Sequence, residues 1–183
     1  LSLHDALPIC SVPAGVEVDF YGKLVSLAKQ GGIPVIVDTS GALLAETVKA
    51  KPTMIKPNTD EIGQLLGRRV QSRQEVIDAA WELHQSGIPY VVVSLGKDGS
   101  VMACEEGIFQ GITPDIPVVN TVGCGDSMVA GFAAAMARGK GPEEMLRLAT
   151  AVSTANALTM QTGHFEQEDL DRVLPLTAVK KIK

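Results

Sequence analysis

Short, continuously apolar runs alternate along this chain with segments of helical spacing. Ile33 to Val37 and Tyr90 to Ser94 are apolar throughout, which is the pattern of strands covered on both faces. Phe20 to Gln30 has apolar residues at helical spacing and is followed by two glycines. This alternation predicts an α/β fold in which helices cover both faces of a mainly parallel sheet.

Capping and turn signals predict the remaining elements. Ser72-Arg-Gln-Glu75 is a capping box and predicts a helix that runs to Gln85. Ser100 to Cys104 and Gly107 to Ile112 predict a hairpin. Further helices are expected at 42–50, 59–66, 125–137 and 142–160, and further strands at 53–56 and 116–119. Polar residues follow several of these strands, at the end of a sheet where ligands of such folds bind.

The most informative stretch is Asn120-Thr-Val-Gly-Cys-Gly-Asp-Ser-Met-Val-Ala-Gly-Phe132. A glycine-flanked turn leads into a helix of small apolar residues, and the free N–H groups of such a helix start attract an anion. Gly123 and Gly125 have no Cβ to keep a phosphate away. We therefore interpret Gly123, Cys124 and Gly125 as a phosphoryl cradle and Asp126 as a catalytic base. A plain tight turn is the alternative for a Gly-x-Gly-Asp string alone.

This stretch resembles the C-terminal signature of the PfkB (ribokinase-like) carbohydrate kinases, and other segments match the same family in the same order. They are Val37-Asp-Thr-Ser-Gly41, Lys56-Pro-Asn58 with Glu61, Val93-Ser-Leu-Gly-Lys-Asp-Gly99, and Ala155-Asn-Ala157 with Thr162-Gly163. The similarity is greatest to the hexose-phosphate branch, which holds 1-phosphofructokinase and tagatose-6-phosphate kinase. It implies a ribokinase-like three-layer αβα fold without the family's N-terminal part and β-lid.

The resemblance also implies roles for individual residues. Ser94, Leu95, Gly96, Lys97, Asp98 and Gly99 would form a nucleotide-phosphate loop. Asn58 and Glu61, three residues apart on one helical turn, would organise Mg²⁺ through water, and Asn156 would contact adenine. The alternatives are an ordinary turn, a helix cap and tight helix packing, respectively. Lys56 is expected either to touch a phosphate or to lie on the surface with its ammonium in water.

The activity implied by the resemblance is ATP-dependent phosphorylation of a ketohexose phosphate to a bisphosphate. Fructose 1-phosphate is the first expectation for the acceptor and tagatose 6-phosphate the second, and an inactive nucleotide-binding fragment is a further alternative. Mg²⁺, and K⁺ as a monovalent cation, are the implied cofactors, and a homodimer is the implied assembly. A dinucleotide oxidoreductase is disfavoured because no Gly-x-Gly-x-x-Gly follows a first strand.

The chain departs from the family pattern at a few places. Cys124 stands where the family has Ala, Gly or Ser, and Cys10-Ser-Val-Pro13 stands for Gly-Ser-Leu-Pro. A thiol at a helix N-terminus can be unusually reactive, and a small packing residue is the alternative for Cys124. Residues 1–9 match nothing in the pattern, so we expect them to be a non-native scar and residues 10–183 to be the nucleotide-binding and catalytic part of one kinase domain.

Composition narrows the classes of partner. The 183 residues carry 16 Lys and Arg against 21 Asp and Glu, a net charge of −5 without a basic run, which argues against nucleic acid. No apolar run reaches the length of about 18 residues that a membrane span needs. The cysteines Cys10, Cys104 and Cys124 are odd in number and lack metal-ligand spacing, which favours the reducing cytoplasm.

Overall fold

A single sheet runs through the computed structural model of the chain, which describes residues 7–9 and 15–183. In this part of the chain the sheet has seven strands in sequence order: β1 (Leu7–Ile9), β2 (Val35–Val37), β3 (Met54–Ile55), β4 (Tyr90–Ser94), β5 (Ser100–Cys104), β6 (Gly107–Ile112) and β7 (Ala178–Lys181). Neighbours from β1 to β4 are parallel, and neighbours from β4 to β7 are antiparallel. The described sheet is therefore mixed.

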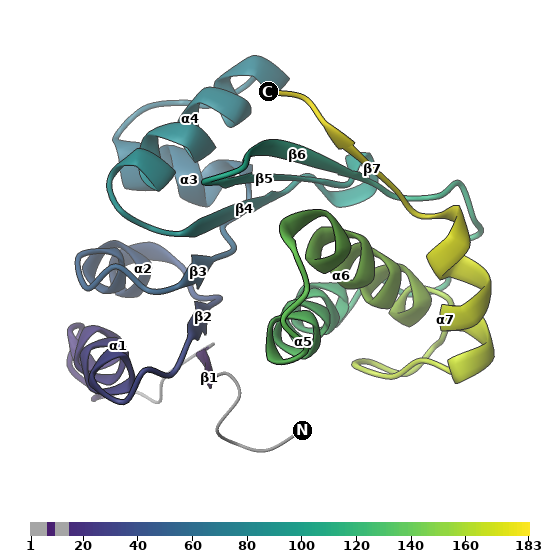
Figure 1. Ribbon diagram of the computed structural model, residues 1–183, viewed down its shortest axis with the longest axis horizontal. Coiled ribbons are helices and arrows are strands. Elements are labelled where there is room, and N and C mark those ends of the chain that lie inside the picture. Colours follow the sequence, from purple (N-terminus) through teal and green to yellow (C-terminus); the bar gives the residue numbers. More distant parts are fainter. Residues whose placement is uncertain (1–6, 10–14) are drawn as a thin grey trace.

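Helices cover both faces of this sheet (Figure 1). On one side lie α1 (Phe20–Gln30), α2 (Gly41–Val48), α3 (Thr59–Leu66) and α4 (Arg73–Gln85). On the other side lie α5 (Cys124–Ala137), α6 (Pro142–Asn156) and α7 (Gln167–Val173). Short 3₁₀ helices occupy Gly96–Asp98 (η1) and Leu174–Leu176 (η2). The predicted three-layer α/β architecture is confirmed.

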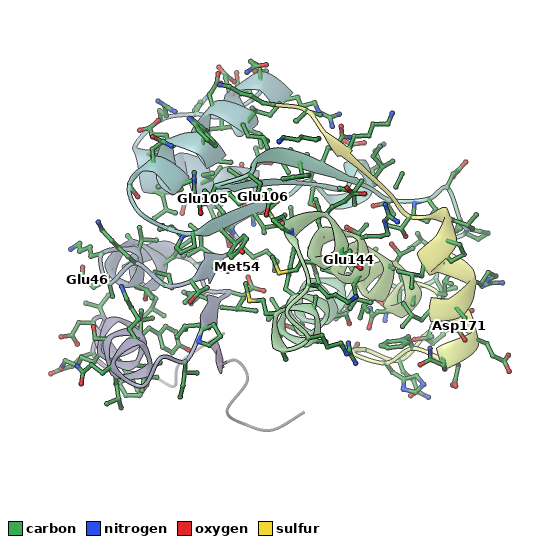
Figure 2. The ribbon with its side chains drawn as sticks, in the orientation of Figure 1. Glu46, Met54, Glu105, Glu106, Glu144 and Asp171 are labelled. Atoms are coloured by element: carbon green, nitrogen blue, oxygen red, sulfur yellow. The ribbon has the colours of Figure 1, made fainter. Side chains whose placement is uncertain are left out.

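The sheet supplies side chains to a separate core on each face. Successive side chains of a strand point to opposite faces. Val91 and Val93 accordingly pack into the core beneath α1–α4, whereas Val92 packs with Phe132 beneath α5 and α6. Met54 of β3 belongs to the second core, and Figure 2 shows it between the sheet and α5. Continuous apolar runs are needed here because both faces of these strands are buried.

Several predicted elements are confirmed at their boundaries, including α1, α3, β4 and the β5–β6 hairpin. The capping box of α4 is also confirmed: Ser72 Oγ accepts the Glu75 N–H at 3.2 Å, and Glu75 Oε2 accepts the Ser72 N–H at 2.8 Å. Backbone N–H groups of Gln71 and Ser72 lower the pKa of the Glu75 carboxyl, because they bond to its ionised form.

The strand predicted at 116–119 is wrong, because this segment is an irregular loop. Pro117 has no N–H to donate to a ladder. The N–H groups of Val119 and Asn120 instead donate to the Ala157 carbonyl, at 2.8 and 3.2 Å. The same contact accompanies the end of α6 at Asn156, earlier than the predicted 160. The loop before α5 and the loop after α6 therefore lie against each other.

The C-terminal elements α7 and β7 were not predicted from the sequence. β7 pairs antiparallel with β6, and Ala178 lies opposite Ile112 at the start of the pairing. Pairing partners this far apart in sequence leave little local signal. Of the predicted scar at 1–9, the structure describes only Leu7–Ile9, so the scar stays a prediction. The Cys10–Pro13 segment lies outside the described residues. Within the described residues, no helix combines the length and apolarity needed to cross a membrane.

Candidate active site

Polar residues that follow the parallel strands meet at one edge of the sheet. Asp38 follows β2, Lys56 follows β3, and Ser94 ends β4. The Lys56 N–H donates to the Val37 carbonyl at 3.1 Å, and the Ser94 N–H donates to the Pro57 carbonyl at 3.0 Å, so the strands stay in register at this edge. The carboxyl ends of parallel strands form a common rim, as the sequence predicted.

The N-terminus of α5 opens onto this rim. Gly123 is its N-cap, with a φ of 83° that favours glycine, and no side chain caps the helix. Within the described part of the chain, the N–H groups of Gly125 and Asp126 have no acceptor. These donors, together with the positive end of the helix dipole, provide a site for an anion.

A buried ammonium group lies beside this helix terminus. Lys56 is only 6% exposed, and its Nζ lies 3.1 Å from Asp38 Oδ2. A Cβ placed on Gly125 would lie 3.5 Å from Lys56 Nζ and 3.9 Å from Asp38 Oδ2. The alternative of a surface lysine is therefore wrong for Lys56. Its charge adds to the attraction that the α5 N-terminus exerts on an anion.

A cleft of about 310 Å³ connects the predicted nucleotide loop with the α5 N-terminus. Its wall includes Lys56, Ser94, Gly96, Lys97, Gly99, Cys124 and Gly125. Ile116, Val118 and Met128 contribute apolar surface to the same cleft. Small-molecule sites commonly combine an apolar wall with a few polar groups in a volume of this order. Four residues of the predicted Ser94–Gly99 loop and two of the predicted cradle, Cys124 and Gly125, therefore line one cavity.

Other predicted residues face a second, wider hollow of about 590 Å³. Asn58, Leu95 and Asp98 line it, together with the start of α4. Ser94 lines both hollows, and the other residues of the Ser94–Gly99 loop line one hollow or the other. Only part of the predicted nucleotide loop faces the cleft beside Gly125.

Asn58 and Glu61 form the capping box of α3. Asn58 Oδ1 accepts the N–H groups of Asp60 and Glu61, both at 2.9 Å, and Glu61 Oε2 accepts the Asn58 N–H at 2.8 Å. The helix-cap alternative is therefore present in the structure. Glu61 Oε1 has no partner among the described residues, so it fits a water of hydrated Mg²⁺. No group of three or more acidic, His or Cys side chains among these residues could hold a metal directly.

Asn156 is completely buried, so the predicted contact with adenine is not the arrangement seen. Its Nδ2 donates to the Val122 carbonyl at 3.0 Å, and its Oδ1 accepts the His164 N–H at 3.2 Å. The side chain is therefore committed to backbone groups of two loops. The packing alternative describes Asn156 in this structure.

Asp126 and Cys124 lie on either side of Gly125 with different surroundings. Asp126 is exposed, and its carboxylate has no bond to another described residue, which leaves it free for a substrate. Cys124 is half-buried and lines the cleft, and its Sγ lies 3.4 Å from Asn156 Nδ2. The roles of Asp126 as a base and of Cys124 as a reactive thiol stay predictions.

The comparison with protein families matches residues 2–169 to the model of the pfkB family carbohydrate kinases. The chain belongs to this family. A tagatose-6-phosphate kinase from Staphylococcus epidermidis is 39% identical over 166 residues, which are 89% of this chain and 54% of that protein. The chain thus spans about half the length of the curated relatives that it matches.

Solved pfkB-type structures have the same fold. Phosphofructokinase-2 from Escherichia coli in complex with potassium superposes with a TM-score of 0.88 at 32% identity, over 93% of this chain and 56% of that one. The tetrameric inhibited form of the same enzyme gives a TM-score of 0.84 at 32% identity, over 93% and 55% of the two chains.

Within this carbohydrate kinase fold, the sequence analysis gave Asp38 no role, although Asp38 is one of the polar residues that follow the predicted strands, and it left Lys56 undecided. Both follow a strand that the sequence predicted, and that position was the signal available for finding them. Ser153 was also missed: its Oγ donates to the Cys124 carbonyl at 2.9 Å and it lines the cleft. A polar residue on a helix gives no such signal, because its partner is known only after the helices pack.

Proposed function

We propose that the protein to which this chain belongs transfers the γ-phosphoryl group of ATP to a hydroxyl of a ketohexose phosphate, giving a bisphosphate. One observation carries the proposal. The free N–H groups of Gly125 and Asp126 and the Lys56 ammonium lie together where Gly125 lines one cleft, and the next residue of α5, Asp126, has an exposed carboxylate without a partner among the described residues. Phosphoryl transfer to an alcohol needs an anion site and a base in this arrangement.

The residues of this chain have distinct tasks in that reaction. The N–H groups at the start of α5 and the Lys56 ammonium stabilise negative charge on the transferred phosphoryl group. Asp126 Oδ accepts the proton of the attacking hydroxyl as the new P–O bond forms. Glu61 would hold a water of hydrated Mg²⁺, and that ion would offset the charge of the nucleotide phosphates.

The cleft would hold the nucleotide with its phosphates toward α5. Ser94, Gly96 and Gly99 in its wall would contact the phosphates, and Ile116 and Val118 would provide an apolar surface for the base. Lys97 contributes a further positive charge at the same wall. Leu95 and Asp98 line the other hollow, so in this placement they would support the loop rather than contact the nucleotide.

Two acceptors follow from the proposal. Fructose 1-phosphate is the expectation from the signature segments, and the 39% identical relative named tagatose-6-phosphate kinase makes tagatose 6-phosphate the second candidate. The test is ADP release by the full-length protein with fructose 1-phosphate, tagatose 6-phosphate or fructose 6-phosphate at fixed Mg²⁺–ATP. A preference in kcat/KM names the acceptor, whereas no turnover with any of them contradicts the proposed reaction.

An alternative for the 183-residue chain taken alone is nucleotide binding without turnover. Described residues of this chain form the cleft proposed for the nucleotide. The chain, however, matches only about half the length of each curated relative. Calorimetry with ATP, beside the ADP-release assay on the same sample, distinguishes the two. Binding with no ADP release selects the alternative, and turnover with a sugar phosphate excludes it.

Two further properties, a monovalent cation and an oligomeric state, are proposed by analogy with the family. A monovalent cation is one, because the relative from Escherichia coli was solved with potassium; activity in KCl against choline chloride tests it. A homodimer in the cytoplasm is the proposed state of the full-length protein, and sedimentation of that protein tests the assembly.

A further inference from the structure

Asn156 joins three segments around the proposed phosphate site. It is the last residue of α6 and is 0% exposed. Its Nδ2 donates to the Val122 carbonyl at 3.0 Å and approaches Cys124 Sγ at 3.4 Å, and its Oδ1 accepts the His164 N–H at 3.2 Å. A primary amide has two N–H donors and a carbonyl oxygen with two lone pairs, and Asn156 uses both donors and one lone pair here.

The turn held by Asn156 has two described hydrogen bonds of its own, from the Val122 N–H to Asn120 Oδ1 at 3.0 Å and from the Cys124 N–H to the Thr121 carbonyl at 3.3 Å. Gly123 caps α5 with φ 83° and without a side-chain hydrogen bond. The 162–163 loop packs directly on it: a Cβ on Gly123 would lie 2.7 Å from the Gly163 nitrogen and 2.9 Å from Thr162 Cγ2. From outside, the turn is held by Asn156, by Ser153 Oγ, which donates to the Cys124 carbonyl at 2.9 Å, and by the 162–164 loop, to which Asn156 also bonds.

We propose that Asn156 is a positioning residue for phosphoryl transfer, acting through Val122 and Cys124 rather than by contact with the nucleotide. The proposal rests on the proposed function, since the turn matters only if the free N–H groups after it bind a phosphate. A buried amide suits this task because it donates to the turn and accepts from the 162–164 loop at the same time. Aspartate of equal size keeps the acceptor for His164 but loses both donors to the turn.

The first measurement compares Asn156→Asp with the unchanged chain by hydrogen–deuterium exchange without ligand. We expect exchange at residues 120–126 to accelerate about tenfold, the effect of losing a hydrogen bond of ordinary strength, while residues 94–99 are unchanged. Thr177→Val is the matched control, because it removes another buried hydrogen bond, from Thr177 Oγ1 to the Val173 carbonyl, in the C-terminal segment. Unchanged exchange at 120–126 in Asn156→Asp would overturn the proposal.

The second measurement separates positioning from adenine recognition. We expect Asn156→Asp to weaken ATP binding about tenfold and to leave adenosine binding unchanged, because only the phosphate end depends on the turn. Equal loss for ATP and adenosine, or no loss for either, would overturn the proposal. Asn156→Ala is measured in parallel, because it removes the same donors without adding a charge that would itself repel the phosphates. Loss of ATP affinity in Asn156→Asp alone would overturn the proposal. If the unchanged chain binds no ATP, the proposed nucleotide site is refuted. Hydrogen–deuterium exchange at residues 120–126 would still show whether Asn156 holds the turn.

Discussion

The ammonium group of Lys56 lies 3.1 Å from Asp38 Oδ2, and both lie next to Gly125 in the first turn of α5. The two residues come from the ends of neighbouring parallel strands, β2 and β3. With side chains only 6% and 21% exposed, the pair is mostly shielded from water. An ammonium group in this position is held in place before an anion arrives, so it loses little conformational freedom on binding.

Replacing Lys56 with Met should weaken ATP binding by about ten- to a hundredfold, the effect of losing a charge-assisted hydrogen bond. It should also lower the free energy of unfolding by about 3 kcal/mol, because Asp38 is left unpaired. Calorimetry and urea unfolding measure the two effects. Lys140→Met, at an exposed ion pair with Glu144, is the control for loss of charge alone.

The double variant Lys56→Met with Asp38→Leu separates binding from stability. Removing both charges should recover most of the lost stability, because no unpaired charge remains buried, while ATP affinity stays low. Recovery of ATP affinity in the double variant would show that Lys56 acts only through the stability of the fold.

Alanine at two glycines of α5 should have opposite consequences. At Gly125 the nearest atom to a new Cβ is Lys56 Nζ at 3.5 Å, so the fold should be unchanged or slightly more stable, while the methyl group narrows the anion site and weakens ATP binding. At Gly131 a new Cβ would lie 2.6 Å from Ala149 Cα, and forcing α5 and α6 apart should cost about 1–3 kcal/mol. Melting curves and ATP titrations of both variants check this contrast, which fails if Gly125→Ala binds ATP normally.

Asp126→Asn should lower kcat of the full-length enzyme by about 10²–10⁴-fold, the usual contribution of a general base. ATP binding should persist, because the N–H groups at the start of α5 and Lys56 are untouched. Single-turnover kinetics with the preferred sugar phosphate measure the chemical step directly. A rate near that of the unchanged enzyme would refute the assignment of the base.

Glu61→Gln should raise the Mg²⁺ concentration needed for half-maximal activity while the melting temperature changes little. Glutamine can still accept the Asn58 N–H and keep the capping box, but the charge that attracts hydrated Mg²⁺ is lost. Glu75→Gln is the matched control, because it makes the same change in the capping box of α4. Equal Mg²⁺ dependence in the two variants would leave Glu61 as a helix cap alone.

Stability should fall in alkaline solution because of Cys104. Burial raises the pKa of its thiol above the ordinary value of 9.0. The unfolded chain then loses this proton before the folded chain does, so the stabilisation is complete below about pH 9 and is lost as the pH rises through the higher folded value. Urea unfolding at about pH 8 and pH 10 measures the fall, and Cys104→Ala should reduce it. Tyr90, whose pKa burial also raises, adds a similar fall above its ordinary value of 10.0.

Local signals in the sequence determined most of the elements and the sequence of chemical motifs. The continuous apolar run at 90–94, the helical spacing at 20–30 and the capping box at Ser72 each report a preference that a few neighbouring residues set, and each is confirmed. The glycines around Cys124 likewise predicted a helix start with free N–H groups, because that geometry needs only a short stretch of chain.

Tertiary structure alone decided which side chains meet. Lys56 was compatible with a surface position until the packing of α5 against the sheet edge enclosed it with Asp38. Asn156 was expected near adenine, but its amide donates to the Val122–Cys124 turn and accepts from the loop after α6. Residues 116–119 have the composition of a strand, yet the N–H groups of Val119 and the following Asn120 donate to the Ala157 carbonyl, about 40 residues later. Contacts between segments so far apart depend on how helices and sheet fit together, which local sequence preferences do not encode.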